Sequence, residues 1–358
     1  MKTVCKIKYV MLFFNKIKFL ERSKRCARRQ IMTKKSVTIN DVAKYAGVSR
    51  SMVSYVLCHG ERGSSTPETR EKIYNAVKAL GYRVNHTARS LRSGKTRNIG
   101  VVLPSLQMYL YELIVELEKS FRKYDYTLTY NFFERSSNLD GFIAAMERQF
   151  QTNVDAVITP SFDYTEPSPV PIIIWGNKVP GFDCVFVDKE TYGHDVIRRL
   201  LSLGHRKIAV CGRLTEVRYK GMRDELAAHG LDFYARLSTQ NDELQQRGIT
   251  AIREIAALKE LPDVIIFHDD ELALSAVGAA FDSGWKIPDD ISVVSYGRTP
   301  LSGAIRPTLA TYDIDWKRTA DMLASVTLKR LENPEMPFQQ MSVTAEFVPG
   351  NSLKDKTV

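Results

Sequence analysis

The chain is poor in cysteine and contains no long hydrophobic run. Its 358 residues include five cysteines, which are scattered, odd in number and never spaced as C-x-x-C. A disulfide framework is therefore not expected, and we interpret all five as reduced thiols in a cytoplasmic protein. No apolar run approaches the roughly 18 residues that a membrane-spanning helix needs, so no membrane segment is expected.

The sequence also lacks a catalytic constellation, because it has neither a nucleophile–base pair in a known motif nor H-E-x-x-H. His268, Asp269 and Asp270 are consecutive on a predicted strand, where side chains alternate between faces, so they cannot converge on one metal ion. Gly94-Lys95-Thr96 does not end a phosphate-binding loop, since Arg89 stands where the first glycine belongs and no strand precedes it. We therefore expect no enzyme, no metal and no cofactor.

Charge is unevenly distributed along a chain that is long enough for two or three domains. The net charge is +10, and residues 1–35 carry 12 Lys and Arg against one acidic residue. Residues 36–98 carry 11 against four, whereas residues 99–358 carry 28 against 36. A basic segment joined to an acidic body predicts a small module that binds phosphates and a body that DNA repels.

Residues 38–57, TINDVAKYAGVSRSMVSYVL, have the pattern of a helix-turn-helix. Thr38 is placed to cap the first helix, with Asp41 three residues later, close to a capping box. Gly47 supplies the left-handed residue that ends this helix, and Ser49 caps the next one.

The second helix of this pattern has an apolar stripe of Val53, Val56 and Leu57. Its other residues include Arg50, Ser51 and Ser54, which point elsewhere, as the residues of a DNA-reading helix must. The alternative is an ordinary helical hairpin inside a core. A third helix follows, in which Thr66-Pro67-Glu68 provides a cap, a proline at the first position and an acid in the first turn, with Gly81 after the last residue.

Four segments together resemble the lactose/galactose repressor (LacI/GalR) family of bacterial transcription regulators. These are TINDVAKYAGVS, TPETREKI, NHTARSLRSGKT and IGVVLP. The similarity is collinear over about residues 36–350, and the combination is far more specific than any one motif.

The resemblance implies that Arg50 and Ser51 occupy the main base-specifying positions. Arg50 can bond both acceptors of a guanine. Tyr55 lies one turn further, where relatives often have arginine; it is either a third base contact or a partly buried residue packed on the third helix. The residues predicted to contact phosphates or to cap helices are Thr38, Lys44, Ser49, Ser54 and Arg70.

Residues Asn85–Leu91 are too few and too polar to form a stable helix alone. The resemblance implies that this hinge folds on the operator, paired with its twin in a second subunit. Leu91 would then wedge into a minor-groove step, Ala88 would allow close helix approach, and Arg89 would hold the DNA backbone. A core leucine is the alternative for Leu91.

From Ile99 onward, strand patterns alternate with amphipathic helix patterns, which predicts parallel sheets covered by helices on both faces. The predicted strands are Ile99–Leu103, Tyr126–Phe132, Val154–Thr159, Pro171–Trp175, Cys184–Val187, Lys207–Cys211, Val264–His268, Ile291–Tyr296 and Met341–Phe347. The predicted helices are Leu110–Tyr124, Leu139–Phe150, Tyr192–Leu203, Lys220–His229, Glu243–Leu258, Leu272–Ser283 and Trp316–Leu331. The resemblance implies two periplasmic-binding-protein-like lobes with a ligand cleft between them.

Family members bind a small molecule, usually a sugar, in this cleft. Arg218 matches the arginine that grips ligand hydroxyls, and Asp269-Asp270 matches the family's Asn-Asp pair, at a strand end that faces the crevice. Trp175 can stack on a sugar ring. Relatives commonly have Asp-Arg at Gly176-Asn177 and Asp-Asp at Gly297-Arg298, so an atypical or phosphorylated ligand, or none, stays open. One of the two aspartates is also expected to cap the following helix.

We therefore predict a homodimeric regulator that represses carbohydrate-related genes by binding double-stranded DNA at a palindromic operator. A sugar or sugar phosphate between the lobes would change operator affinity. A periplasmic-type ligand-binding protein without DNA function, and a regulator controlled by a partner protein, are the alternatives.

The predicted boundaries follow from these patterns. Residues 1–35 form a basic extension, of which 1–31 are disordered or a start-site artefact because Met32 resembles a natural start. Residues 36–83 form the helix-turn-helix domain, 84–97 the hinge helix and linker, 98–350 the two-lobed body, and 351–358 a polar tail.

Overall fold

The computed structural model describes residues 37–59, 64–82, 95–104, 108, 110–133, 139–160, 167–212, 217–237 and 244–358. The chain divides into two units, Met1–Arg89 and Ser90–Val358, which are described separately below. The predictions for residues 1–35 and for the hinge residues Asn85, Ala88, Arg89 and Leu91 fall outside the described residues. Within those residues, no helix combines the length and the apolar character needed to span a membrane.

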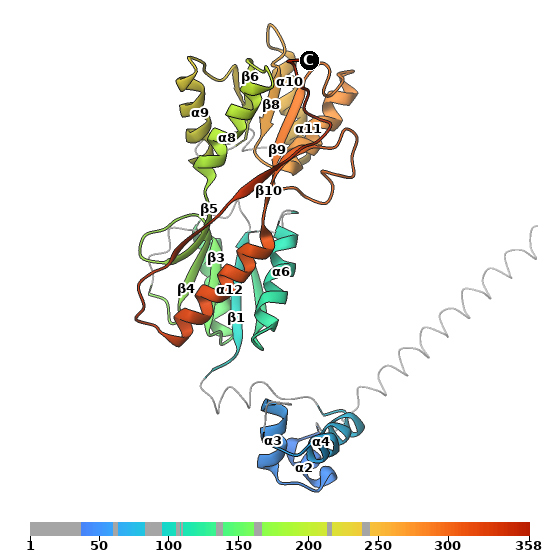
Figure 1. Ribbon diagram of the computed structural model, residues 1–358, viewed down its shortest axis with the longest axis vertical. Helices are drawn as coiled ribbons and strands as arrows, with labels where there is room; N and C mark the ends of the chain where they lie inside the picture. The colour runs from blue at the N-terminus through green and yellow to red at the C-terminus, as the bar shows by residue number, and fades with distance from the viewer. Residues whose placement is uncertain are drawn as a thin grey trace, which may run out of the picture. The chain divides into compact units, whose positions relative to one another are not determined.

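The described part of the first unit holds three helices, whose ends follow the predicted signals. They are α2 (Ile39–Ala46), α3 (Arg50–His59) and α4 (Pro67–Leu80), labelled in Figure 1. The capping box is present, because Thr38 Oγ1 accepts the Asp41 N–H and the Asp41 carboxylate accepts the Thr38 N–H. Gly47 and Gly81 both have the left-handed φ expected of helix-ending glycines, 66° and 62°. The helices share a small core made of Val42, Ala43, Val53, Val56, Ile73 and Ala76.

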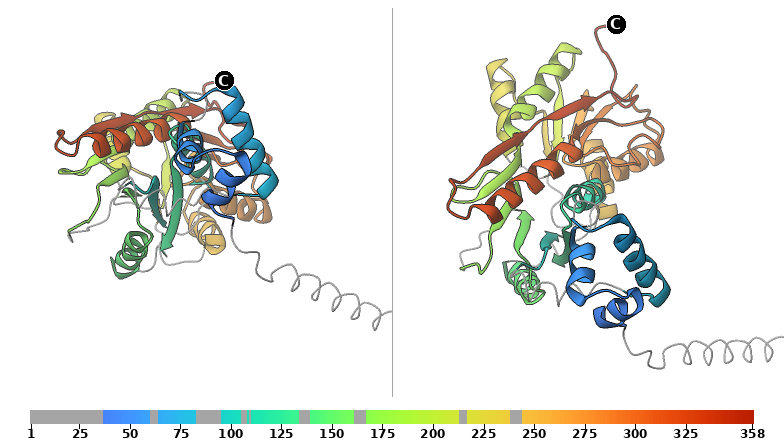
Figure 2. Two further views of the ribbon diagram at one scale, coloured as in Figure 1. Left: turned by 90° about the horizontal axis from the view of Figure 1, so that it is seen from below. Right: turned by 60° about the horizontal axis from the view of Figure 1, so that its bottom comes forward.

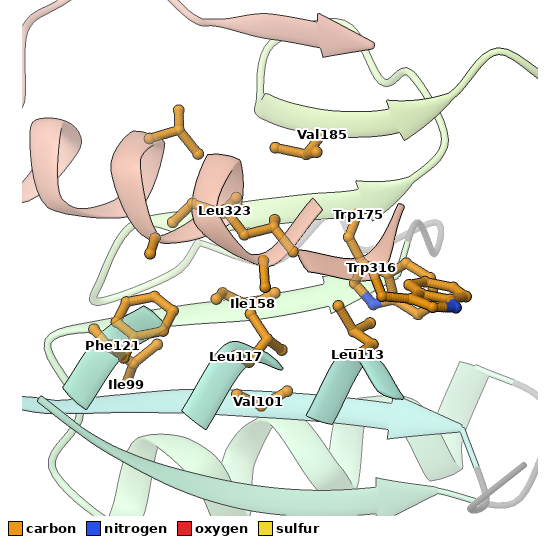
Figure 3. Packing of buried hydrophobic residues seen from close by; sticks show 14 of the residues in the cluster. Ile99, Val101, Leu113, Leu117, Phe121, Ile158, Trp175, Val185, Trp316 and Leu323 are labelled. Atoms are coloured by element: carbon orange, nitrogen blue, oxygen red, sulfur yellow. The ribbon is translucent and has the colours of Figure 1, made fainter. Parts of the chain in front are cut away.

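A six-stranded parallel sheet forms the first lobe of the second unit, in the order β11-β5-β4-β3-β1-β2. Its strands are β1 (Asn98–Pro104), β2 (Thr127–Phe133), β3 (Ala156–Pro160), β4 (Ile172–Gly176), β5 (Asp183–Val187) and β11 (Gln340–Val343). Its helices are α6 (Leu110–Arg122), α7 (Leu139–Gln151) and α12 (Trp316–Glu332). Successive residues of β1 point to opposite faces, so Val101 packs under α6 and α12 while Val102 packs under α7. Figure 3 shows α6 and α12 side chains, including Leu117 and Leu323, over the sheet.

The second lobe repeats this arrangement with the strand order β12-β10-β9-β8-β6-β7. Its strands are β6 (Ile208–Cys211), β7 (Ala235–Leu237), β8 (Val264–Phe267), β9 (Ser292–Tyr296), β10 (Ala310–Ile314) and β12 (Ala345–Val348). Its helices are α8 (Lys189–Ser202), α9 (Val217–Ala228), α10 (Leu244–Ala256) and α11 (Asp270–Asp282). Ile266 of β8 faces α8 and α9, whereas its neighbour Ile265 faces α10 and α11. The predicted α/β body of two helix-covered lobes is therefore confirmed.

The chain passes between the lobes after β5, after β10 and after β11. Figures 1 and 2 show β11 and β12 as one long ribbon that spans both lobes. The prediction of a single strand over Met341–Phe347 is wrong, because Thr344 separates two strands that belong to different sheets. Of these two strands, β11 pairs parallel with β5, whereas β12 pairs antiparallel with β10. The second sheet is therefore mixed. Strands β7 and β10 were not predicted.

The tail after β12 is tied to the second lobe, which its polar composition does not predict. Ser352 is fully buried; its Oγ accepts the Ala310 N–H and donates to the Val293 carbonyl. The Lys354 carbonyl accepts a hydrogen bond from Nε2 of the buried His205 at 2.9 Å. These contacts make residues 351–357 a strap across β9, β10 and the turn between α8 and β6.

Candidate functional site

The amino-terminal turn of α3 presents exposed polar side chains on a capped helix end. Ser49 Oγ accepts the Met52 N–H at 3.1 Å, which confirms Ser49 as the N-cap. Arg50 and Ser51 follow directly and are exposed, whereas Ser54 is half-buried. Ser51 Oγ lies 2.9 Å from Ser49 Oγ, so this hydroxyl is tied to the cap. Arg50 is therefore the residue of this turn whose long side chain carries exposed hydrogen-bond donors at the amino-terminal end of α3.

Two further interactions relate α3 to the residues that flank α4. Burial raises the pKa of Tyr82, and the positive charge of Arg50 opposes that rise, which places Arg50 near the end of α4. Tyr55 is half-buried, and its hydroxyl accepts the Ser64 N–H at 3.0 Å. Hydrogen bonds from Ser64 lower the pKa of Tyr55. Tyr55 thus contacts the segment that leads into α4, close to the packing role considered for it as an alternative.

In the second lobe, Arg218 lies in the first turn of α9 and is only 8% exposed. Its Nη1 donates to the His268 carbonyl at 2.9 Å, at the carboxyl end of β8. Its guanidinium carbon lies 4.0 Å from the ring centre of Tyr296 and 5.3 Å from that of Tyr192. Cation–π contacts of this kind hold a buried arginine over aromatic rings. The sequence did not identify Tyr192, Tyr296 or the His268 carbonyl as neighbours of Arg218.

Two glycines set the distance between α8 and α9. A Cβ atom at Gly193 would lie 2.3 Å from the Arg218 carbonyl oxygen, and one at Gly221 would lie 2.3 Å from the Glu190 carbonyl oxygen. No side chain fits at either position without a shift of backbone. This close crossing fixes the backbone from which the Arg218 side chain extends.

The two aspartates after β8 have different roles. Asp269 is the N-cap of α11 and accepts the Leu272 N–H at 2.8 Å, as expected for one member of the pair. Asp270 is fully buried, and this burial raises its pKa against the opposing effect of its hydrogen bonds. It accepts hydrogen bonds from Ser295, Thr299 and Thr311, at 2.5, 2.6 and 2.9 Å. Asp270 therefore joins α11 to β9 and β10, in place of the predicted contact with a ligand.

Trp175 lies at the carboxyl end of β4 in the first lobe and is 8% exposed. Its ring meets that of Trp316 edge to face, with 6.5 Å between the ring centres. Figure 3 labels both residues. Its Nε1 is buried without a hydrogen-bond partner in the described part of the chain. A ring buried to this extent lacks the broad open face that stacking on a sugar requires.

The residues after β9 have an unusual backbone conformation. Gly297 and Arg298 have positive φ of 117° and 39°, and such a φ is uncommon for an arginine. Arg298 Nη1 donates to Asp313 at 2.6 Å, on the strand that leads to the first lobe. Burial, followed by the charge of Asp313, raises the pKa of Glu112 on α6, and the charge of Arg298 opposes this rise. Arg298 thus places a cation beside the acids Asp313 and Glu112, where the resemblance predicts two aspartates.

Comparisons with known proteins agree with this architecture. Residues 38–85 match the family described as bacterial regulatory proteins, lacI family, and residues 197–353 match the periplasmic binding protein-like domain. Catabolite control protein A of Priestia megaterium is 31% identical over 303 residues, covering 78% of this chain and 89% of that protein. The HTH-type transcriptional repressor PurR of Photorhabdus laumondii is 28% identical over 335 residues, covering 89% and 97%.

Solved structures show the same fold. The lac repressor dimer bound to operator and the anti-inducer ONPF has a TM-score of 0.75 at 23% identity, covering 89% of this chain and 99% of that one. The cellobiose complex of the transcriptional regulator CelR has a TM-score of 0.61 at 21% identity, covering 88% and 99%. A helix-turn-helix of the matched family and a two-lobed body thus occur in one chain, in the same order as in these relatives. The chain belongs to the lacI family of bacterial regulatory proteins and is a DNA-binding transcriptional regulator with an effector-binding carboxyl-terminal body.

Proposed function

We propose that the protein is a homodimeric repressor that binds a palindromic operator through α3. The observation that carries this proposal is the capped amino end of α3, which exposes Arg50 and Ser51 on a helix of the size that enters the major groove. Thr38, Ser49 and Ser54 position the unit, the first two by capping α2 and α3. The hinge residues Asn85, Ala88, Arg89 and Leu91 belong to the proposal on sequence grounds alone.

Dimerisation is proposed on two grounds. A single unit of this size reads few base pairs, so two copies are needed for a site that is rare in a genome. The related lac repressor is described as a dimer bound to operator. Two-fold symmetry then predicts inverted half-sites about one helical turn apart. A protein that acts on chromosomal DNA in this way works in the cytoplasm.

We further propose that a small molecule in the cleft modulates operator affinity, and that the regulated genes concern carbohydrate use. The Arg218 side chain and Asp269 both lie at the carboxyl end of β8 in the second lobe, and ligands bind at such strand ends in α/β sheets. CelR, of the same fold, is described in complex with cellobiose. Gly297-Arg298 in place of two acids removes negative charge from this strand end, which supports an anionic ligand, such as a sugar phosphate, over a neutral sugar. Trp175 would line the cleft on the side of the first lobe.

Two experiments test these proposals. Genomic fragments selected by the full-length protein and sequenced should share an inverted repeat, and the neighbouring genes identify the pathway. A thermal-shift screen with sugars, sugar phosphates and nucleosides should then find a ligand that raises the melting temperature. If fragments are selected but no small molecule shifts the melting temperature, control by a partner protein replaces the cleft ligand in this account.

A further inference from the structure

We propose that Tyr55 is a positioning residue, which clamps α3 to the segment entering α4 and does not read a base. This inference rests on the proposed operator binding through α3. Tyr55 follows Ser51 by one helical turn, so its Cα lies on the side of α3 that also carries Ser51. Its hydroxyl, however, is bound back to the protein.

The clamp consists of two contacts with one residue. The Tyr55 hydroxyl oxygen accepts the Ser64 N–H at 3.0 Å and lies 3.0 Å from Ser64 Oγ. A phenol group has one hydrogen to donate and accepts through its oxygen. Ser64 occupies the oxygen through its amide, and its hydroxyl takes either the phenol hydrogen or a further acceptor position. In either arrangement, two contacts of 3.0 Å with Ser64 hold the phenol group against the protein.

Because Ser64 lies just before α4, its contact with Tyr55 fixes the orientation of α3 relative to the start of α4. Ser64 lies two residues before Thr66, the N-cap of α4, whose Oγ1 accepts the Thr69 N–H at 3.3 Å. The Tyr55 contact spans nine positions of sequence and joins the carboxyl-terminal half of α3 to the start of α4. The two helices otherwise meet through a core of few buried side chains. A polar tie of this kind limits rocking of α3, and recognition groups need to be held within about 0.5 Å of their working positions.

Two consequences follow for operator recognition. Base discrimination comes from the first turn of α3, where Arg50 is exposed, and not from the position of Tyr55. Loss of the clamp should weaken binding to all preferred operators by a similar factor, because the orientation of the whole helix becomes less defined. Loss of a base contact would instead change the preferred base at one position.

The test uses the full-length chain and a library of randomised operator sites. The variants are Tyr55→Phe, which removes only the hydroxyl, Ser64→Ala, their combination, and Arg50→Ala as a reference for a base reader. Tyr74→Phe is the matched control, since Tyr74 is 44% exposed on α4 and no hydrogen bond of its hydroxyl is found among the described residues. Ser64→Thr, which keeps both the amide and a hydroxyl, is the conservative variant.

We expect Tyr55→Phe to weaken operator binding by about 3- to 10-fold, the effect of one neutral hydrogen bond, with the preferred base unchanged at every position. Ser64→Ala should weaken binding less than Tyr55→Phe does. The double variant should bind operator at most about twofold more weakly than Tyr55→Phe, because both changes break the same contact. Ser64→Thr and Tyr74→Phe should bind like the unmodified protein. A changed base preference in Tyr55→Phe, or unchanged affinity, would overturn the clamp.

Hydrogen exchange separates this inference from the proposed function. The Ser64 amide should exchange slowly in the free protein and faster in Tyr55→Phe, whether or not any operator is found. Equal exchange rates in the two proteins contradict the clamp. If the unmodified protein selects no DNA, the proposed function is contradicted. The exchange rates of the Ser64 amide then test by themselves whether Tyr55 clamps α3.

Discussion

The backbone of Gly193 on α8 lies directly against the carbonyl group of Arg218 on α9, so that a Cβ atom at Gly193 would be 2.3 Å from the Arg218 oxygen. The side chain of the same Arg218 donates to the His268 carbonyl at the end of β8. Helix packing and the placement of the proposed effector arginine therefore depend on one close contact.

Gly193→Ala should move α9 and lower the free energy of unfolding by about 1–3 kcal/mol, as overpacking of a filled core does. Gly278→Ala is the control, because no atom lies within 4 Å of its Cβ position on α11 and alanine favours a helix. Urea unfolding measures the free energy of unfolding of both variants. Equal stability of the two variants would show that α8 and α9 can separate without cost.

A buried histidine predicts a defined dependence of stability on pH. Burial lowers the pKa of His205, whose Nε2 donates to the Lys354 carbonyl and whose Nδ1 has no partner within the described residues. The unfolded chain therefore takes up a proton near pH 6.5 before the folded chain does. The free energy of unfolding should therefore keep its full contribution from the neutral His205 above that pH. It should fall as the pH drops below that value, by at most about 1.4 kcal/mol per pH unit.

The variant His205→Gln keeps an N–H donor for the Lys354 carbonyl but cannot take up the proton. Its loss of stability between pH 7.5 and pH 5.5 should be smaller than that of the unmodified protein in chemical denaturation. A loss of equal size in both proteins would assign the pH dependence to other groups.

One buried ion pair should dominate the electrostatic stability of the first lobe. Arg330 Nε donates to Asp183 at 2.7 Å, and the side chains are 7% and 1% exposed. Asp183→Asn leaves the guanidinium buried with no counter-charge there and should cost about 3–5 kcal/mol. Asp289→Asn, which breaks the exposed pair with Lys354, is the control and should leave thermal unfolding nearly unchanged. A small effect of Asp183→Asn would show that water reaches the pair.

Arg50→Ala should relax base preference at one operator position while leaving nonspecific affinity nearly intact, with a loss of about 1–3 kcal/mol on the preferred operator. Lys44→Ala is the comparison, because Lys44 is exposed at the end of α2 and is proposed to contact phosphate. It should weaken binding to all sequences alike and reduce the salt dependence. Fluorescence anisotropy on matched and mismatched duplexes distinguishes the two patterns.

Local signals made much of the fold predictable from the sequence. Thr38 with Asp41, the glycines Gly47 and Gly81, and Ser49 each specify a helix end through backbone groups within a few residues. The alternation of strands and helices in the body is equally local, since it depends on side-chain periodicity.

Features that depend on distant residues were not predictable. The break at Thr344 separates strands that pair with β5 and with β10, and neither partner is adjacent in sequence. Asp270 receives hydrogen bonds from residues 25 to 41 positions away, so its burial is invisible in the motif around it. The edge-to-face contact of Trp175 with Trp316 likewise joins residues of widely separated segments.

Footprinting of the full-length protein on its selected genomic fragments at moderate salt tests the central claim most directly. The account predicts protection of two inverted half-sites about one helical turn apart, by a species that sedimentation shows to be a dimer. A protein that remains monomeric and protects no duplex in preference to random DNA would contradict it.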